Sequence, residues 1–407
     1  MTTNLHDILE STKLDPAFCA DLLSVSVEQF RDWLNGVRPL PKFVLPELAS
    51  VLGVNEDSLL GQASQRRLNS DSLAPAIWYK LRNEKLTDAD RELVGLIRKL
   101  GFYIDQLQAV RQQKVRQWKP LFETIRDSVN TGEPPAVQGR TAAEAFRGAL
   151  DFGRGHAGIG EQLRPALRRQ GVLVVESPIR SQVEGCTFAV GVEDPKTPCL
   201  FANSYRSTWF RRNAILLHEL AHAILDLDSD PVALDFKDEV QTELSEVRAQ
   251  AFAQECLVPA SLLNRIANRR GIHWNKLEPQ DLATLVADTH AEQSLVLRAA
   301  LQSGYIDEDE AQLYQSFEVD GLVRQQTPHA LTTREYLKSI AEKSPKWAAE
   351  NRNTGVGRRP IRLPVGYVID VLAAWQTDEI STGKAAEMLM MDKDVFLDRF
   401  GETKLAD

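Results

Sequence analysis

The chain has 407 residues, with 26% charged and 43% hydrophobic residues and a net charge of −9 at pH 7. This length allows two or three domains with sizeable cores, and the acidic balance argues against a protein that coats nucleic acid. The four cysteines form no C-x-x-C pair, and no apolar run approaches the ~20 residues of a membrane span. We therefore expect a cytoplasmic protein without a signal peptide, a disulfide framework or a membrane partner.

Residues 1–65 have the hydrophobic spacing of a small helical domain. Ser26 is a good N-cap for a second helix, and Asn35-Gly36 is typical of a helix stop. The segment resembles the helix-turn-helix of the Cro/cI-type repressors, and the resemblance implies a DNA-binding or dimerising domain. It depends on Ala20, Val25, Phe30, Leu34, Asn35 and Gly36.

The charge of this segment does not suit DNA. Residues 1–60 hold four basic and nine acidic residues, a net charge of −5, and Glu28 and Asp32 lie on the expected recognition helix. DNA binding draws much of its affinity from Lys and Arg on phosphates. DNA binding stays open, but the balance favours contact with a protein partner.

A helical connector is expected over residues 66–140, and the segment Asn130–Pro135 breaks its helices. Residues 141–305 then read as the catalytic domain. It begins with helices over 142–151 and 159–170. Short strands rich in β-branched or apolar residues are predicted at 171–176, 186–191 and 198–203.

The strongest motif is His218-Glu219-Leu220-Ala221-His222, which lies inside an apolar run. On a helix the two histidines stand one turn apart on the same face, so that both imidazoles can bind one zinc ion. Glu219 stands beside them, where it can accept a proton from the attacking water. The same five-residue pattern also occurs on helices that bind no metal, so the rest of the sequence must distinguish a zinc-binding helix from an ordinary one.

A catalytic zinc ion usually has three protein ligands. Downstream of His222, Glu246 is the preferred third ligand because Ala249, Phe252 and Ala253 follow it on an inward face; Glu243 is the competing candidate. Gln250 lies one turn after Glu246 and is predicted to hydrogen-bond a ligand imidazole from the second shell.

Residues 141–305 resemble the ImmA/IrrE family of zinc metallopeptidases. The resemblance is specific in Leu167–Val175, Leu200–Asn203, Arg211–His222 and the segment from Glu246 to Pro259. Gln250 stands where the family usually has Asn, and Cys256 where it usually has Leu. The resemblance implies a zincin-like fold of the gluzincin type, Zn²⁺ bound by His218, His222 and Glu246, and repressor proteins as substrates. The family also often joins its peptidase to a Cro/cI-like unit.

The remainder of the chain is expected to be largely helical. Residues 277–298 have a second helix-turn-helix rhythm, in which His290 is a turn residue rather than a ligand. Residues 306–360 are predicted to be a linker region, and residues 361–407 a C-terminal helical module with a further helix-turn-helix rhythm.

Taken together, the sequence predicts a mostly helical α+β protein that acts as an intracellular zinc endopeptidase. Its expected partner is a helix-turn-helix repressor whose cleavage switches on stress, phage or defence genes. The alternative is a DNA-binding regulator or antitoxin-like protein that uses the zinc fold for contacts; the oligomeric state is open. The oxyanion donor is unranked among Tyr205, Arg211, Arg212 and Arg248.

Overall fold

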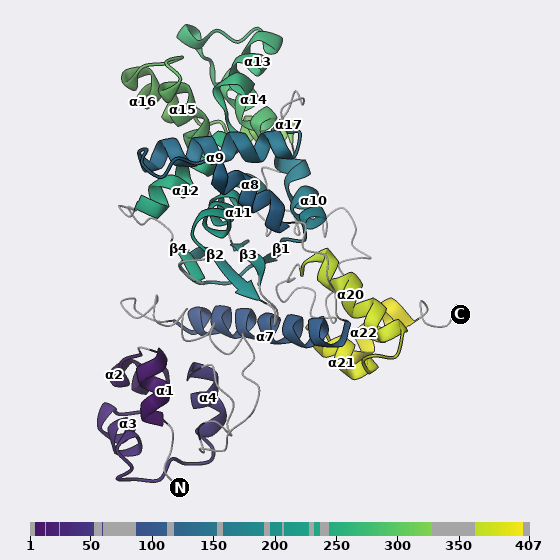
Figure 1. Cartoon of the computed structure of the whole chain (residues 1–407). Coiled ribbons are helices and arrows are strands. Elements are labelled where there is room, and N and C mark those ends of the chain that lie inside the picture. Colours follow the sequence, from purple (N-terminus) through teal and green to yellow (C-terminus); the bar gives the residue numbers. More distant parts are fainter. Residues whose placement is uncertain are drawn as a thin grey trace. The chain divides into compact units, whose positions relative to one another are not determined.

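The structure is a computed structural model and contains two compact units (Figure 1). The first is formed by Met1–Lys114, Phe188–Thr197 and Tyr367–Asp407, and the second by Val115–Thr187 and Pro198–Gly366. The residues that the structure describes are 5–12, 14–23, 25–52, 59, 87–111, 118–152, 158–190, 196–205, 207–227, 232–236, 244–327 and 363–401.

The described residues include a four-stranded sheet. Its strands are β1 (Leu173–Ser177), β2 (Val183–Val190), β3 (Thr197–Asn203) and β4 (Val232–Phe236), in the order β1-β3-β2-β4. β1 pairs in parallel with β3, with Leu173 opposite Cys199 and Ser177 opposite Asn203. The three predicted strands are confirmed, and β4 is an element that the sequence pattern did not predict.

Most of the second unit is helical. Its helices are α8 (Trp118–Asp127), α9 (Pro135–Ala149), α10 (Gly160–Gln170), α11 (Trp209–Leu225), α12 (Leu244–Leu257), α13 (Ala260–Arg270), the 3₁₀ helix η2 (Trp274–Lys276), α14 (Pro279–Thr289), α15 (Gln293–Gln302), α16 (Glu308–Gln315) and α17 (Asp320–Gln326).

The core of this unit is organised around α12, which packs against both α9 and α11. Gly139 makes the contact between α9 and α12 close, because a Cβ atom there would lie 2.2 Å from the backbone oxygen of Arg248. Further along the same pair of helices, the rings of Phe146 and Phe252 lie 5.7 Å apart and both side chains are fully buried. These contacts pack α12 closely against α9.

Several helices lie where the sequence suggested a boundary or a linker. α9 runs through residue 141, where the catalytic domain was expected to begin, so the core uses chain from the predicted connector. In the predicted linker, α16 and α17 are helical and pack against α15 and α14, while residues 328–360 lie outside the described part. α16 begins with a capping box between Asp307 and Glu310. His290 is the left-handed C-cap of α14, as a turn residue should be.

The described part of the first unit consists of helices together with the end of β2 and the start of β3. The helices are α1 (Leu5–Thr12), α2 (Pro16–Leu22), α3 (Val27–Leu34), α4 (Leu45–Leu52), α7 (Asp88–Arg111), α20 (Val365–Gln376), α21 (Thr382–Met388) and α22 (Lys393–Phe400). The predicted cap of α3 is confirmed, because Ser26 Oγ accepts a hydrogen bond from the backbone N–H of Gln29 at 3.1 Å. α3 then ends at Leu34, and Gly36 adopts a φ of 69°.

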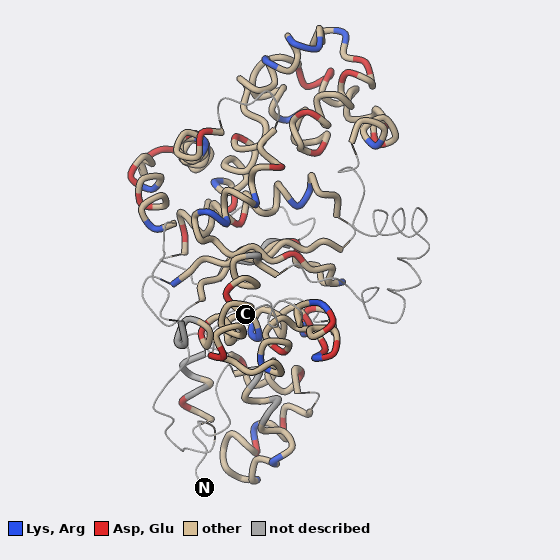
Figure 2. Tube along the Cα trace, turned by 90° about the vertical axis from the view of Figure 1, so that its right-hand side faces the viewer, with Lys and Arg blue, Asp and Glu red and all other residues tan. Residues whose placement is uncertain are grey.

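The C-terminal helices of this unit contact α7. The Tyr103 hydroxyl on α7 donates a hydrogen bond to Glu387 at 2.7 Å, and the Lys384 ammonium lies 4.9 Å from the centre of the Tyr103 ring. Acidic and basic residues are interspersed along the described helices (Figure 2). Within the described ranges, no helix combines the length and apolar character needed to cross a bilayer.

Candidate metal centre

α11 carries the two histidines of the motif on a helix that is buried along almost its whole length. Thr208 caps its start by accepting a hydrogen bond from the backbone N–H of Arg211 at 3.1 Å. His218 and His222 follow one turn apart and are 6% and 3% exposed, because the apolar residues around them pack into the core. Their Nε2 atoms lie 3.2 Å apart, so both imidazoles face the same point.

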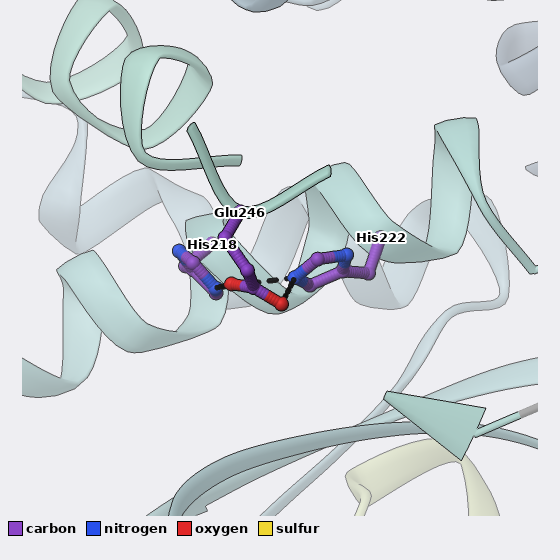
Figure 3. A group of neighbouring side chains, drawn as sticks. All are labelled: His218, His222 and Glu246. Carbon is purple, nitrogen blue, oxygen red and sulfur yellow. Dashed lines mark hydrogen bonds and ion pairs between the residues drawn. The ribbon is translucent and has the colours of Figure 1, made fainter. Parts of the chain in front are cut away.

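Glu246, in the first turn of α12, completes this group (Figure 3). Its Oε2 lies 3.0 Å from Nε2 of His218, and its Oε1 lies 3.3 Å from Nε2 of His222. One potential ligand atom from each of the three residues falls within 4.8 Å of the others. The residues that the sequence nominated as metal ligands are therefore brought together from two packed helices.

The spacing of these atoms suits a tetrahedral metal ion. With metal–ligand bonds of ~2.0–2.1 Å, two ligands at the corners of a tetrahedron lie about 3.3 Å apart. Here the two Nε2 atoms lie 3.2 Å apart, and the Glu246 carboxylate offers Oε2 at 3.0 Å from His218 and Oε1 at 3.3 Å from His222. Two imidazoles and one carboxylate also form a donor set that catalytic zinc sites use. The residues present therefore fit a metal ion, and His218, His222 and Glu246 are the ones that could hold it.

Hydrogen bonds with neighbouring side chains shift the pKa values of His222 and Glu246. Burial would lower the pKa of His222, but its hydrogen bonds with Asp226 and Glu246 outweigh burial and raise the pKa to about 10. Burial would raise the pKa of Glu246, but its hydrogen bonds with His218 and His222 hold the pKa below its ordinary value. Glu246 therefore stays ionised, as a carboxylate ligand must, while a proton and a metal ion compete for His222.

Glu219 is fully buried and its carboxylate is held against β2. The Thr187 hydroxyl lies 2.7 Å from Oε2 of Glu219 and 2.6 Å from its backbone oxygen, so it donates to one of them at a time. Gly185, two residues earlier on β2, leaves room for the carboxylate: an added Cβ would lie 2.2 Å from Oε1 of Glu219. Residues two apart on a strand share a face, so the pair forms a seat for Glu219. Sequence reasoning did not single out either residue.

The structure shows a polar contact behind His222 that the sequence analysis did not predict. Gln250 is exposed on α12, and its predicted contact with an imidazole stays a prediction. The observed partner of His222 is Asp226, whose Oδ2 lies 2.9 Å from Nδ1. Asp226 lies one turn after His222, a spacing that could have revealed it. Glu243, the competing third ligand, lies outside the described residues.

The arginines considered as oxyanion donors are all engaged in ion pairs. Arg212 is buried and donates to Glu176 and to the Ser207 backbone oxygen, both at 2.9 Å. Arg211 pairs with Glu184, and Arg248 with Asp226. The fourth candidate, Tyr205, has the Arg180 guanidinium 5.7 Å from its ring centre. Among these arginines, Arg248 contacts Asp226, which in turn contacts His222.

Two histidines on one turn of a buried helix, a carboxylate from the next helix and a glutamate beside the first histidine are a residue set that hydrolytic metal sites use. Residues 167–285 match the family model of the M78 peptidases, described as an IrrE N-terminal-like domain. The match includes β1 to β4, α11 and α12, and it supports a metallopeptidase. Comparisons with curated proteins and with solved structures gave no match.

Proposed function

We propose that this protein is a zinc-dependent endopeptidase with His218, His222 and Glu246 as metal ligands and Glu219 as general base. The observation that carries the proposal is that both imidazole Nε2 atoms lie 3.2 Å apart and 3.0–3.3 Å from an oxygen of the Glu246 carboxylate, on a helix that also carries the buried Glu219. The M78 peptidase match over the same residues supports it. A module used only for binding does not require a carboxylate at position 219, which favours catalysis over the regulator alternative.

The mechanism assigns separate tasks to the side chains. When bound, zinc supplies Lewis-acid activation of water and of the scissile carbonyl. Glu219 takes the proton from the attacking water and later delivers it to the leaving amine. The contacts with Thr187 and Gly185 limit the directions in which its carboxylate can turn, so it is oriented before the substrate arrives.

The substrate that we infer is a repressor of the helix-turn-helix type, cleaved in the cytoplasm to switch on stress, phage or defence genes. The support is the resemblance of residues 141–305 to the ImmA/IrrE peptidases. The cysteines agree with a reducing compartment, since all four are buried free thiols.

We further infer that the N-terminal helices contact this partner protein rather than DNA. Only four of residues 1–60 are basic, and one of them, Arg38, is paired with Asp32 at 3.1 Å. In the segment that follows α3, Val37 and Phe43 are 70% and 83% exposed. Exposed apolar side chains beside acidic ones suit a protein surface better than a phosphate backbone.

The proposal is tested by incubating the zinc-loaded full-length protein with repressors encoded beside its gene and identifying fragments by mass spectrometry. Wild-type protein should cleave one of them. Glu219→Gln should retain zinc and lose ~10²–10⁴-fold in rate, the usual cost of removing a general base. Glu308→Gln, which changes an exposed carboxylate on α16, is the matched control and should cleave normally. Equal cleavage by Glu219→Gln and wild type would refute the mechanism.

A further inference from the structure

A chain of polar side chains begins behind the metal centre, at the nitrogen of His222 that faces away from Glu246. Asp226 lies at the C-cap of α11, and its Oδ2 is 2.9 Å from Nδ1 of His222. A proton on Nδ1, donated to this carboxylate, leaves the lone pair of Nε2 facing Glu246 and His218. Between the two tautomers of the neutral ring, Asp226 thus favours the one that can bind a metal ion through Nε2.

The chain continues from Asp226 to α12 and then to α9. Asp226 Oδ1 accepts a hydrogen bond from Nη2 of Arg248, two residues after Glu246. Arg248 Nη1 donates to Oε1 of Gln138 at 3.1 Å. Gln138 Nε2 in turn donates to the backbone oxygens of Glu133 at 2.7 Å and Thr131 at 3.2 Å. Because these carbonyls can only accept, the Gln138 amide is fixed with its oxygen toward Arg248.

Burial and packing make this a rigid arrangement. Gln138 is 6% exposed, and the side chains of Arg248 and Asp226 are 22% and 16% exposed. The neighbouring Gly139 lets the α9 backbone approach that of Arg248 itself, where any Cβ would lie 2.2 Å from the Arg248 oxygen. The close helix contact therefore occurs at the residue whose guanidinium must reach Gln138.

We propose that Gln138, Arg248 and Asp226 are positioning residues that fix the imidazole of His222 for the metal ion. Through Gln138, α9 then contributes to the geometry of the metal centre. The planar guanidinium spans Asp226 and Gln138 at once and neutralises the aspartate charge next to the ligands. Gln138 lies outside the segment 167–285 that matches the peptidase family. The inference rests on the metal-binding part of the proposed function and not on the substrate.

Another contact between α9 and α12 provides a matched control. Arg147 on α9 donates hydrogen bonds to the backbone oxygens of Cys256 and Phe152, far along the helices from Glu246. It is as buried as Gln138, at 8% against 6% exposed, but it touches no member of the chain that leads to His222. If the contact between α9 and α12 only stabilised the fold, substitutions at Arg147 and at Gln138 would have the same effect on zinc affinity.

The test measures the zinc affinity of the full-length protein by competition with a chromophoric chelator, together with the melting temperature. Asp226→Asn should weaken zinc binding ~10–100-fold, the usual effect of losing a second-shell carboxylate. Gln138→Leu should weaken it about threefold to tenfold, as for one hydrogen bond. In the double variant the two effects should be less than multiplicative, because Gln138 acts through Asp226. Arg147→Met should lower the melting temperature and leave zinc affinity unchanged.

Arg248→Lys provides a second variant that keeps the charge. One ammonium group cannot reproduce the planar fork, so zinc binding should weaken even if the fold is intact. Wild-type affinity in Gln138→Leu or Arg248→Lys, or fully multiplicative effects in the double variant, would overturn the inference while the proposed metal site stands. A wild-type protein that binds no zinc would instead refute the proposed function.

Discussion

The metal centre and the N-terminal helices use charged residues in different ways. Around His222 the charged groups are partly buried and joined in one network, in which Asp226 and Arg248 each contact two partners. On α3 and the segment after it, Arg38 and Asp32 form an isolated pair, with side chains 66% and 26% exposed. A buried network fixes geometry, whereas an exposed pair contributes little to stability. Substitutions in the first region should therefore change chemistry, and in the second mainly association.

The largest effect is expected at Gly185, which leaves room for the Glu219 carboxylate. Gly185→Ala places a methyl group 2.2 Å from the position of Oε1, and Glu219 is fully buried, so the carboxylate must move. Peptidase activity should fall by at least ~10²-fold, as when a general base is lost, with zinc content unchanged. Gly148→Ala on α9 is the control, because nothing lies within 4 Å of its added Cβ. Equal activity in both variants would mean that β2 does not seat Glu219.

A smaller effect is expected at Thr187. Thr187→Val keeps the shape of the side chain and removes the hydroxyl that contacts Glu219. The turnover number should fall about tenfold, corresponding to ~1.4 kcal/mol for one hydrogen bond, while KM stays unchanged. Thr187→Ser should restore most of the rate. A serine variant as slow as the valine variant would show that packing, and not the hydroxyl, is what matters.

In the N-terminal helices, the expected effect is on the rate of association with the partner protein. Glu28 is exposed on α3, and Glu28→Lys should slow cleavage of the repressor about threefold without changing zinc content, because rim charges act on association. Glu308→Lys on α16 controls for the change in total charge. Unchanged cleavage, or binding of a specific DNA duplex by the wild-type protein with a Kd of ~10⁻⁸ M, would contradict the protein-contact role.

The smallest effect is expected for Arg38. Its pair with Asp32 is exposed, so Arg38→Ala should change the free energy of unfolding by less than about 0.5 kcal/mol in chemical denaturation. A loss above ~1 kcal/mol would show that this pair supports the fold, and the contrast between the two regions would disappear.

The metal ligands and the residues behind them differ in how far the sequence could predict them. The motif indicates His218 and His222 because metal binding demands particular residue types at helical spacing, and the inward face that follows Glu246 indicates it as the third ligand. Their approach to one another within 4.8 Å agrees with that reasoning. Gln138 could not be found in this way: it contacts Arg248 across 110 residues of sequence, and Gly139 looks like an ordinary helical glycine until α12 is packed on it.

The remaining differences between the predicted and the observed fold lie in two segments rich in polar residues. The acidic segment after α11 reads as a break, yet it contains Asp226, the partner of His222, and precedes β4. The polar residues after 306 read as a linker, although Asp307 and Glu310 have the spacing of a capping box and do start α16. In both places the polar residues make hydrogen bonds that hydrophobic periodicity does not reveal.

The measurement that tests the account most directly is the metal content of the purified full-length protein by plasma mass spectrometry. The geometry of His218, His222 and Glu246 predicts about one zinc ion per chain in the wild-type protein. The variant with His218→Ala and His222→Ala should contain almost none while keeping its helical circular dichroism spectrum. Stoichiometric zinc in this folded double variant would contradict the assignment of the metal centre.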